Sequence, residues 1–411
     1  MTMEELAVNG GTPIRTQPFP PRQPFGHREE QLLVEALRSQ NLFGKEGTKV
    51  KQLEQDFAEL FKVEYAQAST SGTAAIHTAV GVVNPDPGDE IITAPITDPG
   101  SVMPILYQNA VPVFADVDPL TLNMTPQSIE ANITDRTRAI ILVHLFGRPC
   151  DIEPVLAIAE KHNLILIEDC CQTHATKYKE QYAGTYGHMG CFSFQQSKHM
   201  TTGDGGMIIT NDESTYIRLK LFSDKGWDYK YLGHRNHAFL APNYRMTEMQ
   251  GAVGIAQLEK LRAVVKRRIE LGKLLTNLIT DAPGITTVPF EDDREVSWWN
   301  YIFHANGIDP DEFCKNVRAE GVPLNAHYIA DPIYMRGNFL TEKNTYGSSG
   351  FPFDSQYVSR EYTYSPELVP NAVKGLGTVI VCGIHEHMSE GDIRDMAAAI
   401  NKVAAAMKLA S

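Results

Sequence analysis

Positive charge, cysteine and long apolar runs are all scarce in this sequence of 411 residues. Its 37 lysines and arginines face 50 aspartates and glutamates, which gives a formal net charge of −13. This balance argues against a nucleic-acid backbone or an anionic membrane as the main partner, although a local basic pocket can still bind a small anion. No uninterrupted apolar stretch reaches the roughly 20 residues that a membrane helix needs.

Six cysteines in so long a chain do not make a disulfide framework. Most of them have apolar neighbours, so we expect reduced thiols in the core. The opening residues Met1–Leu6 are acidic and lack the basic-then-apolar order of a secretory signal. We therefore expect a cytoplasmic protein.

The length exceeds what one ordinary core accommodates, so two domains are expected. Hydrophobic residues make up 43% of the chain and charged residues 21%, as is typical of a globular protein. No internal repeat or low-complexity tract is present. We expect an N-terminal arm at 1–25, a large domain at 26–265 and a small C-terminal domain at 266–411.

Alternating apolar runs and helical patterns indicate an α/β fold. Helices are predicted over 27–40, 48–61 and 152–162, and strands over 90–93, 111–116, 138–144, 164–168, 187–194 and 206–210. This alternation favours a mainly parallel central sheet, flanked by helices and buried on both faces. A long helix over 247–278 leads into an α+β small domain, which ends in a helix over 389–408.

Lys198 is the residue around which a function can be argued. It follows an apolar strand that carries Ser193 and precedes the glycine-rich turn 203–206, while Asp169 ends an earlier apolar strand. A lysine amine forms a Schiff base with pyridoxal phosphate, and an aspartate keeps the pyridine nitrogen protonated so that the ring accepts electrons. Ligands of open parallel sheets bind beyond the carboxyl ends of strands, where Asp169, Gln172 and the loop with Lys198 fall. The pattern predicts a pyridoxal phosphate site.

The segment 68–77 predicts where the phosphate binds. It follows a short strand and opens a helix with Ser71, Gly72 and Thr73. Free backbone amides and the helix dipole favour a phosphate there, and an ordinary N-cap is the alternative. Ser193 is a second candidate for the phosphate, or else a structural serine of its strand.

Several other polar residues have open roles. A buried Asp169 needs a partner, so a structural ion pair is the alternative to a cofactor role. Gln172 could bond the phenolic oxygen of the cofactor or be a loop glutamine. Asn243 and Arg245 follow an irregular segment at 226–240, and such segments are often functional. Together they could reach a phosphate or carboxylate, or the loop could cap the next helix.

Two further patterns are less specific. His385 and His387 would share one face of a strand, but no third ligand is evident, and we predict no metal site. The run Ser297–Tyr301 contains two tryptophans that could line a substrate pocket or belong to the core. The glycines of turn 203–206 permit a tight return of the chain, and we assign no chemistry to Asp204.

An ordered set of motifs resembles the DegT/DnrJ/EryC1/StrS family of sugar aminotransferases, a branch of the fold-type I pyridoxal phosphate enzymes. The resemblance runs from about Leu6 to Lys408. It rests on the segments Leu6–Arg15, Ser71–Ala75, Pro87–Ile92, Pro112–Asp118, Val143–Asp151, Glu168–Gln172, Ser193–Gly206 and Asn243–Ala252.

The resemblance implies a role for each site residue. Lys198 is the Schiff-base lysine and Asp169 the partner of the pyridine nitrogen, while Gln172 contacts the ring oxygen. Binding of the phosphate group falls to Ser71, Gly72, Thr73 and Ser193. Asn243 is implied to reach the phosphate of the neighbouring subunit, so that a homodimer with shared active sites is expected.

The implied activity is transamination. The amino group would pass from L-glutamine or L-glutamate to a keto-sugar or keto-cyclitol, by a ping-pong mechanism through a Lys198 aldimine. The opening arm and Ser71 match members that act on cyclitols and aminoglycoside precursors. The alternatives are a dehydratase or lyase that uses pyridoxal or pyridoxamine phosphate, and a cofactor-binding sensor without turnover. Dehydratase relatives replace the lysine by histidine, whereas this chain keeps Lys198 and has a histidine only at 199.

One departure from the family concerns the cofactor ring. An aromatic or similarly flat residue usually follows the Pro-x-x-Thr turn and stacks on the ring. Here the turn reads Pro95-Ile-Thr-Asp-Pro-Gly100, with Asp98 near that position. The residue that stacks on the ring is therefore left open by the sequence.

Overall fold

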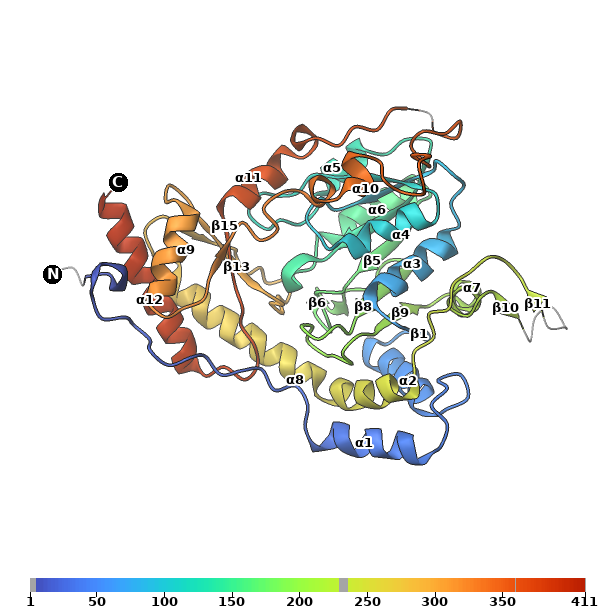
Figure 1. Ribbon diagram of the computed structural model, residues 1–411, viewed down its shortest axis with the longest axis horizontal. Helices are drawn as coiled ribbons and strands as arrows, with labels where there is room; N and C mark the ends of the chain where they lie inside the picture. The colour runs from blue at the N-terminus through green and yellow to red at the C-terminus, as the bar shows by residue number, and fades with distance from the viewer. Residues whose placement is uncertain (1–4, 229–235, 359, 411) are drawn as a thin grey trace.

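The computed structural model describes residues 5–228, 236–358 and 360–410. Within them a seven-stranded sheet has the order β1-β9-β8-β5-β4-β2-β3 (Figure 1). Its strands are β1 (Tyr65–Ser69), β2 (Glu90–Thr93), β3 (Val111–Phe114), β4 (Thr137–Val143), β5 (Ile165–Asp169), β8 (Met189–Ser193) and β9 (Gly206–Thr210). Strand β9 runs antiparallel to both neighbours and the other pairs are parallel, which confirms the mainly parallel sheet.

The central strands are buried on both faces because their side chains are apolar on both faces. Ile140, Ile141 and Ile167, for example, are fully buried. Helices on the two sides of the sheet provide the cover (Figure 1). They are α2 (Lys49–Phe61), α3 (Gly72–Val83), α4 (Met103–Tyr107), α5 (Pro126–Ala131), α6 (Ile152–Lys161) and α7 (Glu213–Ser223). Helix α1 (His27–Arg38) packs instead against the long helix α8 (Glu248–Ile279).

A second, antiparallel sheet has the order β12-β13-β15-β14. Its strands are β12 (Ile285–Thr287), β13 (Tyr301–Ala305), β14 (Asn325–Ala326) and β15 (Val379–Cys382). Helices α9 (Pro310–Ala319) and α11 (Pro370–Thr378) contact this sheet, and α12 (Glu390–Ala410) contacts α9. The chain between β14 and α11 also contains the short helix α10 (Asn338–Thr341). The long helix α8 (Glu248–Ile279) contacts α1 and α2 near one end and α12 near the other (Figure 1). It therefore connects the part of the chain around the first sheet with the part around the second. The long helix and the final helix expected from the sequence are both present.

Short elements complete the chain. Strands β6 (Lys177–Tyr178) and β7 (Gln181–Tyr182) pair, as do β10 (Trp227–Asp228) and β11 (Asn236–His237). Short 3-10 turns lie at Ala7–Asn9, Pro99–Ser101, Leu145–Gly147, Ile333–Arg336 and Pro366–Leu368. The expected irregular segment 226–240 thus contains a two-stranded ribbon, while its residues 229–235 lie outside the described residues.

All six cysteines are free, and five of them are buried, as the sequence predicts. Among the described residues, no helix combines the length and apolar character needed to cross a membrane. The N-terminal arm runs along the outside of α12 and α8 before it enters α1 (Figure 1).

Candidate functional site

A cavity of about 360 Å³ opens where β5 and β8 end and α3 begins. Seven of the residues expected at a cofactor site line it, namely Ser71, Gly72, Thr73, Asp169, Gln172, Ser193 and Lys198. Thr97, Asp98, Ser101, Cys171, Asp204 and Trp299 also contribute. Larger hollows of about 580 and 800 Å³ lie elsewhere, and neither is lined by Lys198.

The amine of Lys198 lies against an aromatic ring. Its Nζ atom is 3.8 Å from the centroid of the Trp299 ring, whose own Nε1 donates to the carbonyl of Ser197 at 3.1 Å. Burial lowers the pKa of Lys198, while the nearby Cys171 and Asp169 act in the opposite direction. A lysine with a lowered pKa is more readily the neutral amine that attacks a carbonyl carbon.

Asp169 is 3% exposed and has local partners. Its Oδ2 accepts a hydrogen bond from the Ser101 hydroxyl at 2.6 Å, and its Oδ1 accepts one from the Cys171 amide at 3.0 Å. These partners are a hydroxyl and an amide, and within the described residues Asp169 forms no salt bridge, so the geometry does not support a structural ion pair. The carboxyl group is held at the cavity wall.

The start of α3 offers the cavity free backbone donors. Ser71 caps the helix, because its Oγ accepts from the Ala74 amide at 3.0 Å. The amides of Gly72 and Thr73 occupy the first turn, where a helix provides no internal acceptor. A Cβ on Gly72 would lie 2.6 Å from the Cβ of Ser193, so only glycine allows this close approach to β8. The N-cap and phosphate readings are therefore compatible at this helix start.

Gln172 is tied to a residue that sequence reasoning missed. Its Oε1 accepts from the Phe146 amide at 2.9 Å, and its side chain lies close enough to Tyr328 to affect the pKa of that hydroxyl. Burial raises the pKa of Tyr328 to about 12, so its hydroxyl stays protonated. Tyr328 follows β14 in the second sheet, and no sequence pattern connects that coil with Gln172.

The turn at Asp98 presents a carboxylate rather than a ring. Asp98 is exposed at the cavity, and its Oδ1 accepts from the Gly100 amide at 2.8 Å. Trp299 is the aromatic residue among those that line the cavity, whereas its neighbour Trp298 is 1% exposed and belongs to the core. Of the two tryptophans in the run Ser297–Tyr301, one thus lines this cavity and the other belongs to the core. Asp204, to which the sequence assigned no chemistry, also lines the cavity.

Asn243 does not line this cavity within one chain. It is exposed, and its Oδ1 accepts from the Arg245 amide at 3.3 Å. Arg245 in turn is paired with Asp224, which also binds Lys45 at 2.8 Å. The structure brings the other seven expected residues together and leaves Asn243 outside.

Histidines near the site have hydrogen-bonding roles. His385 and His387 lie in coil after β15, not on a strand, and His385 Nε2 contacts the Pro20 carbonyl at 3.1 Å. In the described part of the chain, the one cluster with metal-ligand chemistry is His144, Glu168 and Cys170. Glu168 already accepts from three backbone amides and lies 3.0 Å from His144 Nε2, so hydrogen bonds account for this cluster.

Comparison with known proteins places the chain in a family. Residues 25–361 match the DegT/DnrJ/EryC1/StrS aminotransferase family. The chain belongs to that family. Its resemblance to the family, stated above from motifs alone, is confirmed, and so is the fold-type I architecture.

Individual relatives agree with this assignment. The chain is 39% identical over 282 residues to GDP-perosamine synthase of Caulobacter vibrioides, covering 67% of this chain and 75% of the relative. It is 33% identical over 346 residues to a Streptoalloteichus tenebrarius protein provisionally named L-glutamine:3-amino-2,3-dideoxy-scyllo-inosose aminotransferase, covering 82% of this chain and 83% of the relative. An aminotransferase structure from Psychrobacter cryohalolentis superposes with a TM-score of 0.82 at 29% identity, covering 95% of this chain and all of that one.

The family membership makes the chain an enzyme, an aminotransferase of the sugar aminotransferase family. The cavity around Lys198 is its candidate active site, because it gathers a lysine amine of lowered pKa, a buried carboxylate and an open helix start.

Proposed function

We propose that the protein transfers an amino group from L-glutamine or L-glutamate to a keto-sugar or keto-cyclitol, with pyridoxal 5'-phosphate as cofactor and ping-pong kinetics. The observation that carries the proposal is the cavity in which Lys198, Asp169 and the start of α3 face one another. Pyridoxal phosphate fits these residues because they supply an amine, an anion and open phosphate donors in one place. Solved structures that share the fold at 22% identity include pyridoxal and pyridoxamine phosphate forms of one Streptococcus pneumoniae protein.

Each residue would have a distinct task toward the cofactor. Lys198 would carry the cofactor covalently, and Asp169 would hold a proton on the ring nitrogen. The amides of Gly72 and Thr73 would bind the phosphate together with Ser71 and Ser193, and Gln172 would bond the ring oxygen. When bound, the cofactor supplies an electron sink for the carbon that loses its proton.

The chain's own groups then account for the proton movements. When not bound to the cofactor, the Lys198 amine would be a base of lowered pKa at the cavity, so it could remove and return a proton in the amino-group transfer. The hydrogen bonds from the Ser101 hydroxyl and the Cys171 amide hold the Asp169 carboxyl group at the cavity wall, where it would face the ring. The Trp299 ring covers Lys198 and limits the access of water from that side.

The assembly belongs to the same proposal. We propose that 26–265 and 266–411 act as large and small domains and that two chains form a homodimer with shared active sites. Exposed apolar side chains on α1 and on the loop after it support such an interface, namely Val34, Leu37, Leu42 and Phe43. The exposed position of Asn243 fits a role toward the partner's phosphate rather than its own.

The names of two relatives support the donor and the acceptor that we propose. The Streptoalloteichus relative's name specifies L-glutamine and an aminated scyllo-inosose, and the Caulobacter relative's name specifies a GDP-linked amino sugar. Both names support an oxygen-rich ring ketone as acceptor. We propose a cytoplasmic location, which the free cysteines support.

The test is a half-reaction without acceptor. Purified protein loaded with pyridoxal phosphate is mixed with each donor in turn, and the oxo acid is quantified. We expect one of the donors to yield about one oxo acid per site. The reaction should then stop until a keto-cyclitol or keto-sugar is added. Continuous ammonia release without acceptor would instead favour a lyase, and the absence of any reaction with amines would favour a sensor protein.

A further inference from the structure

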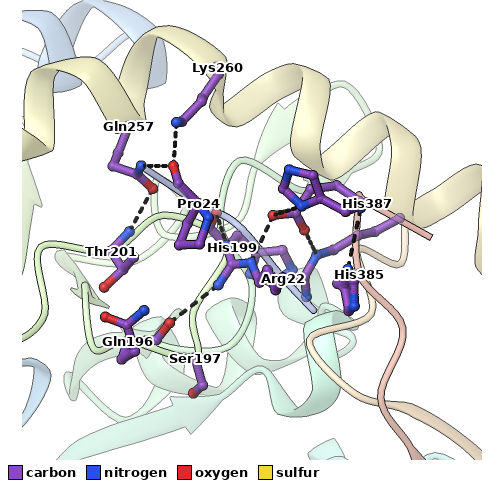
Figure 2. Close-up of polar contacts among 12 residues, drawn as sticks. Arg22, Pro24, Gln196, Ser197, His199, Thr201, Gln257, Lys260, His385 and His387 are labelled. Carbon is purple, nitrogen blue, oxygen red and sulfur yellow. Dashed lines mark hydrogen bonds and ion pairs between the residues drawn. The ribbon is translucent and has the colours of Figure 1, made fainter. Parts of the chain in front are cut away.

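The loop that carries Lys198 is held from outside the cavity by one arginine of the N-terminal arm. Arg22 donates from Nη1 to the carbonyl of Gln196 at 3.3 Å and from Nη2 to the carbonyl of His199 at 2.9 Å (Figure 2). These two carbonyls lie on either side of Lys198 in the sequence. A guanidinium group is suited to this task because its planar fork presents several donors in fixed directions.

The same guanidinium is anchored by a buried carboxylate. Its Nε donates to Glu386 Oε1 at 2.7 Å, while the other oxygen of Glu386 accepts from Arg268 at 2.9 Å. The side chains of Arg22, Glu386 and Arg268 are 16%, 9% and 2% exposed. Burial alone would raise the pKa of Glu386, but Arg268 and Arg22 outweigh it and bring the pKa to about 2. The Glu386 carboxylate is therefore ionised throughout the neutral range.

The second arginine of the bridge leads back to the aromatic ring over Lys198. Arg268 donates from Nη1 to the carbonyls of Trp298 at 3.3 Å and Trp299 at 3.5 Å. The Trp299 ring contacts the Lys198 amine, and its Nε1 donates to the carbonyl of Ser197. One carboxylate, Glu386, thus joins the groups that hold the lysine backbone to the groups that hold the ring against its amine.

The arm is fixed on both sides of Arg22, so the arginine has a defined position. The carbonyl of Pro20 contacts His385 Nε2 at 3.1 Å. The carbonyl of Pro24 accepts from Gln257 Nε2 at 2.7 Å (Figure 2). Gln257 also accepts through Oε1 from the Thr201 amide at 3.2 Å, at the far end of the lysine loop. Gln257 of α8 therefore holds both the arm and the lysine loop, and His385 in the coil after β15 holds the arm.

We propose that Arg22 is a positioning residue that sets the place of the Lys198 amine in the cavity through the Arg22–Glu386–Arg268 bridge. It does not touch the reacting atoms and acts only through the backbone on both sides of Lys198 and through the Trp299 ring. The kinetic consequence rests on the proposed function, whereas the order of the loop does not.

A matched control distinguishes positioning from simple attachment of the arm. Arg15 lies on the same arm and pairs with Asp392 and Asp395 of α12, both at 2.8 Å, and its guanidinium lies over the Phe19 ring. Among the described residues, Arg15 has no hydrogen bond or ion pair to the lysine loop. Arg15→Ala should loosen the arm, while Arg22→Lys and Arg22→Ala should also release the loop.

The experiment compares these variants in the dimer or monomer as purified. Backbone hydrogen exchange is measured by mass spectrometry over residues 195–203, and the rate at which added pyridoxal phosphate gives its lysine-linked visible band is measured by stopped flow. We expect Arg22→Lys to speed exchange in this loop and to slow formation of the band by about ten-fold or more, since small misplacements of a reacting group cost up to a hundred-fold. Arg15→Ala should change both by less than about two-fold.

The results test the role of Arg22 separately from the proposed enzymatic function. Wild-type exchange and wild-type band formation in Arg22→Lys would overturn it, as would an equal loss in Arg15→Ala. If Arg22→Ala does not fold, Arg22→Lys still gives the comparison, because it keeps the positive charge and removes the fork. If the wild-type protein forms no band, the proposed function fails, while the exchange comparison still shows whether Arg22 orders the loop.

Discussion

Exchange of Asp169 for asparagine is the sharpest perturbation of the candidate site, because the structure separates its effect on folding from its effect on chemistry. The asparagine oxygen can still accept from the Cys171 amide. Its amide group can face Ser101, whose hydroxyl lies 2.8 Å from Thr97 Oγ1 and can turn to accept. We therefore expect Asp169→Asn to fold, at a cost of about 1 kcal/mol for the weakened hydrogen bonds.

The chemical effect should be larger. A negative charge in contact with a basic nitrogen raises the pKa of that nitrogen by about 1–3 units, which corresponds to about 1.4–4 kcal/mol. If this stabilisation of the protonated ring is needed in the transition state, its loss lowers the rate by roughly 10- to 1000-fold. The assay is the single-turnover rate of the cofactor band's decay with saturating donor.

Ser101→Ala is the matched control for this prediction. It removes the 2.6 Å hydrogen bond to Asp169 and keeps the carboxylate. We expect it to lose about 1.5–3 kcal/mol of stability, as for hydrogen bonds to charged groups, and to keep most of the rate. A single-turnover rate in Asp169→Asn within about two-fold of wild type would refute the reasoning on the ring nitrogen.

Three other predictions follow from single residues. Lys198→Ala should abolish turnover while noncovalent cofactor binding persists, and turnover near the wild-type value would contradict the assignment of the lysine. Gly72→Ala would place a Cβ 2.6 Å from that of Ser193 and should weaken cofactor binding by about ten-fold or more, measured by equilibrium titration, whereas Gly377→Ala, with no atom within 4 Å, should not. Burial, with a smaller contribution from Lys198, lowers the pKa of His174 from 6.5 to about 3. The stability that the neutral ring contributes should be complete above pH 6.5 and be lost as the pH falls toward 3, and urea midpoints with the same pH slope in His174→Gln would contradict this.

The fold was accessible from the sequence where physical patterns are strong. The apolar runs at 138–144 and 164–168 predicted β4 and β5, because strands buried on both faces must be apolar on both faces. The long helix α8 differs from its predicted range by one residue at each end, since Thr247 and Gln250 form a capping box. The short ribbon β10–β11 was not predicted, because two-residue strands leave no periodicity.

The site was predictable where a sequence motif also shows which end of a strand or helix its residue occupies. Ser71 caps the start of α3, Asp169 ends β5 and Lys198 lies in the loop after β8, so their meeting at one sheet edge follows from topology. Tyr328 was not placed by the sequence, and Trp299 was named only as one of two tryptophans that could line a pocket or belong to the core. Both reach the site from the second sheet through tertiary packing, which no local pattern records. The role of Arg22 could not be predicted from the sequence either, because it binds backbone carbonyls 174 and 177 positions away.

The most direct test of the central claim is the visible absorption spectrum of the purified protein after addition of pyridoxal phosphate, for wild type and Lys198→Ala side by side. We predict a yellow band in the wild type that Lys198→Ala lacks and that one of L-glutamine and L-glutamate bleaches. A wild-type protein without such a band, or a variant with the same band, would contradict the assignment of Lys198. A band that neither donor changes would contradict the proposed transamination.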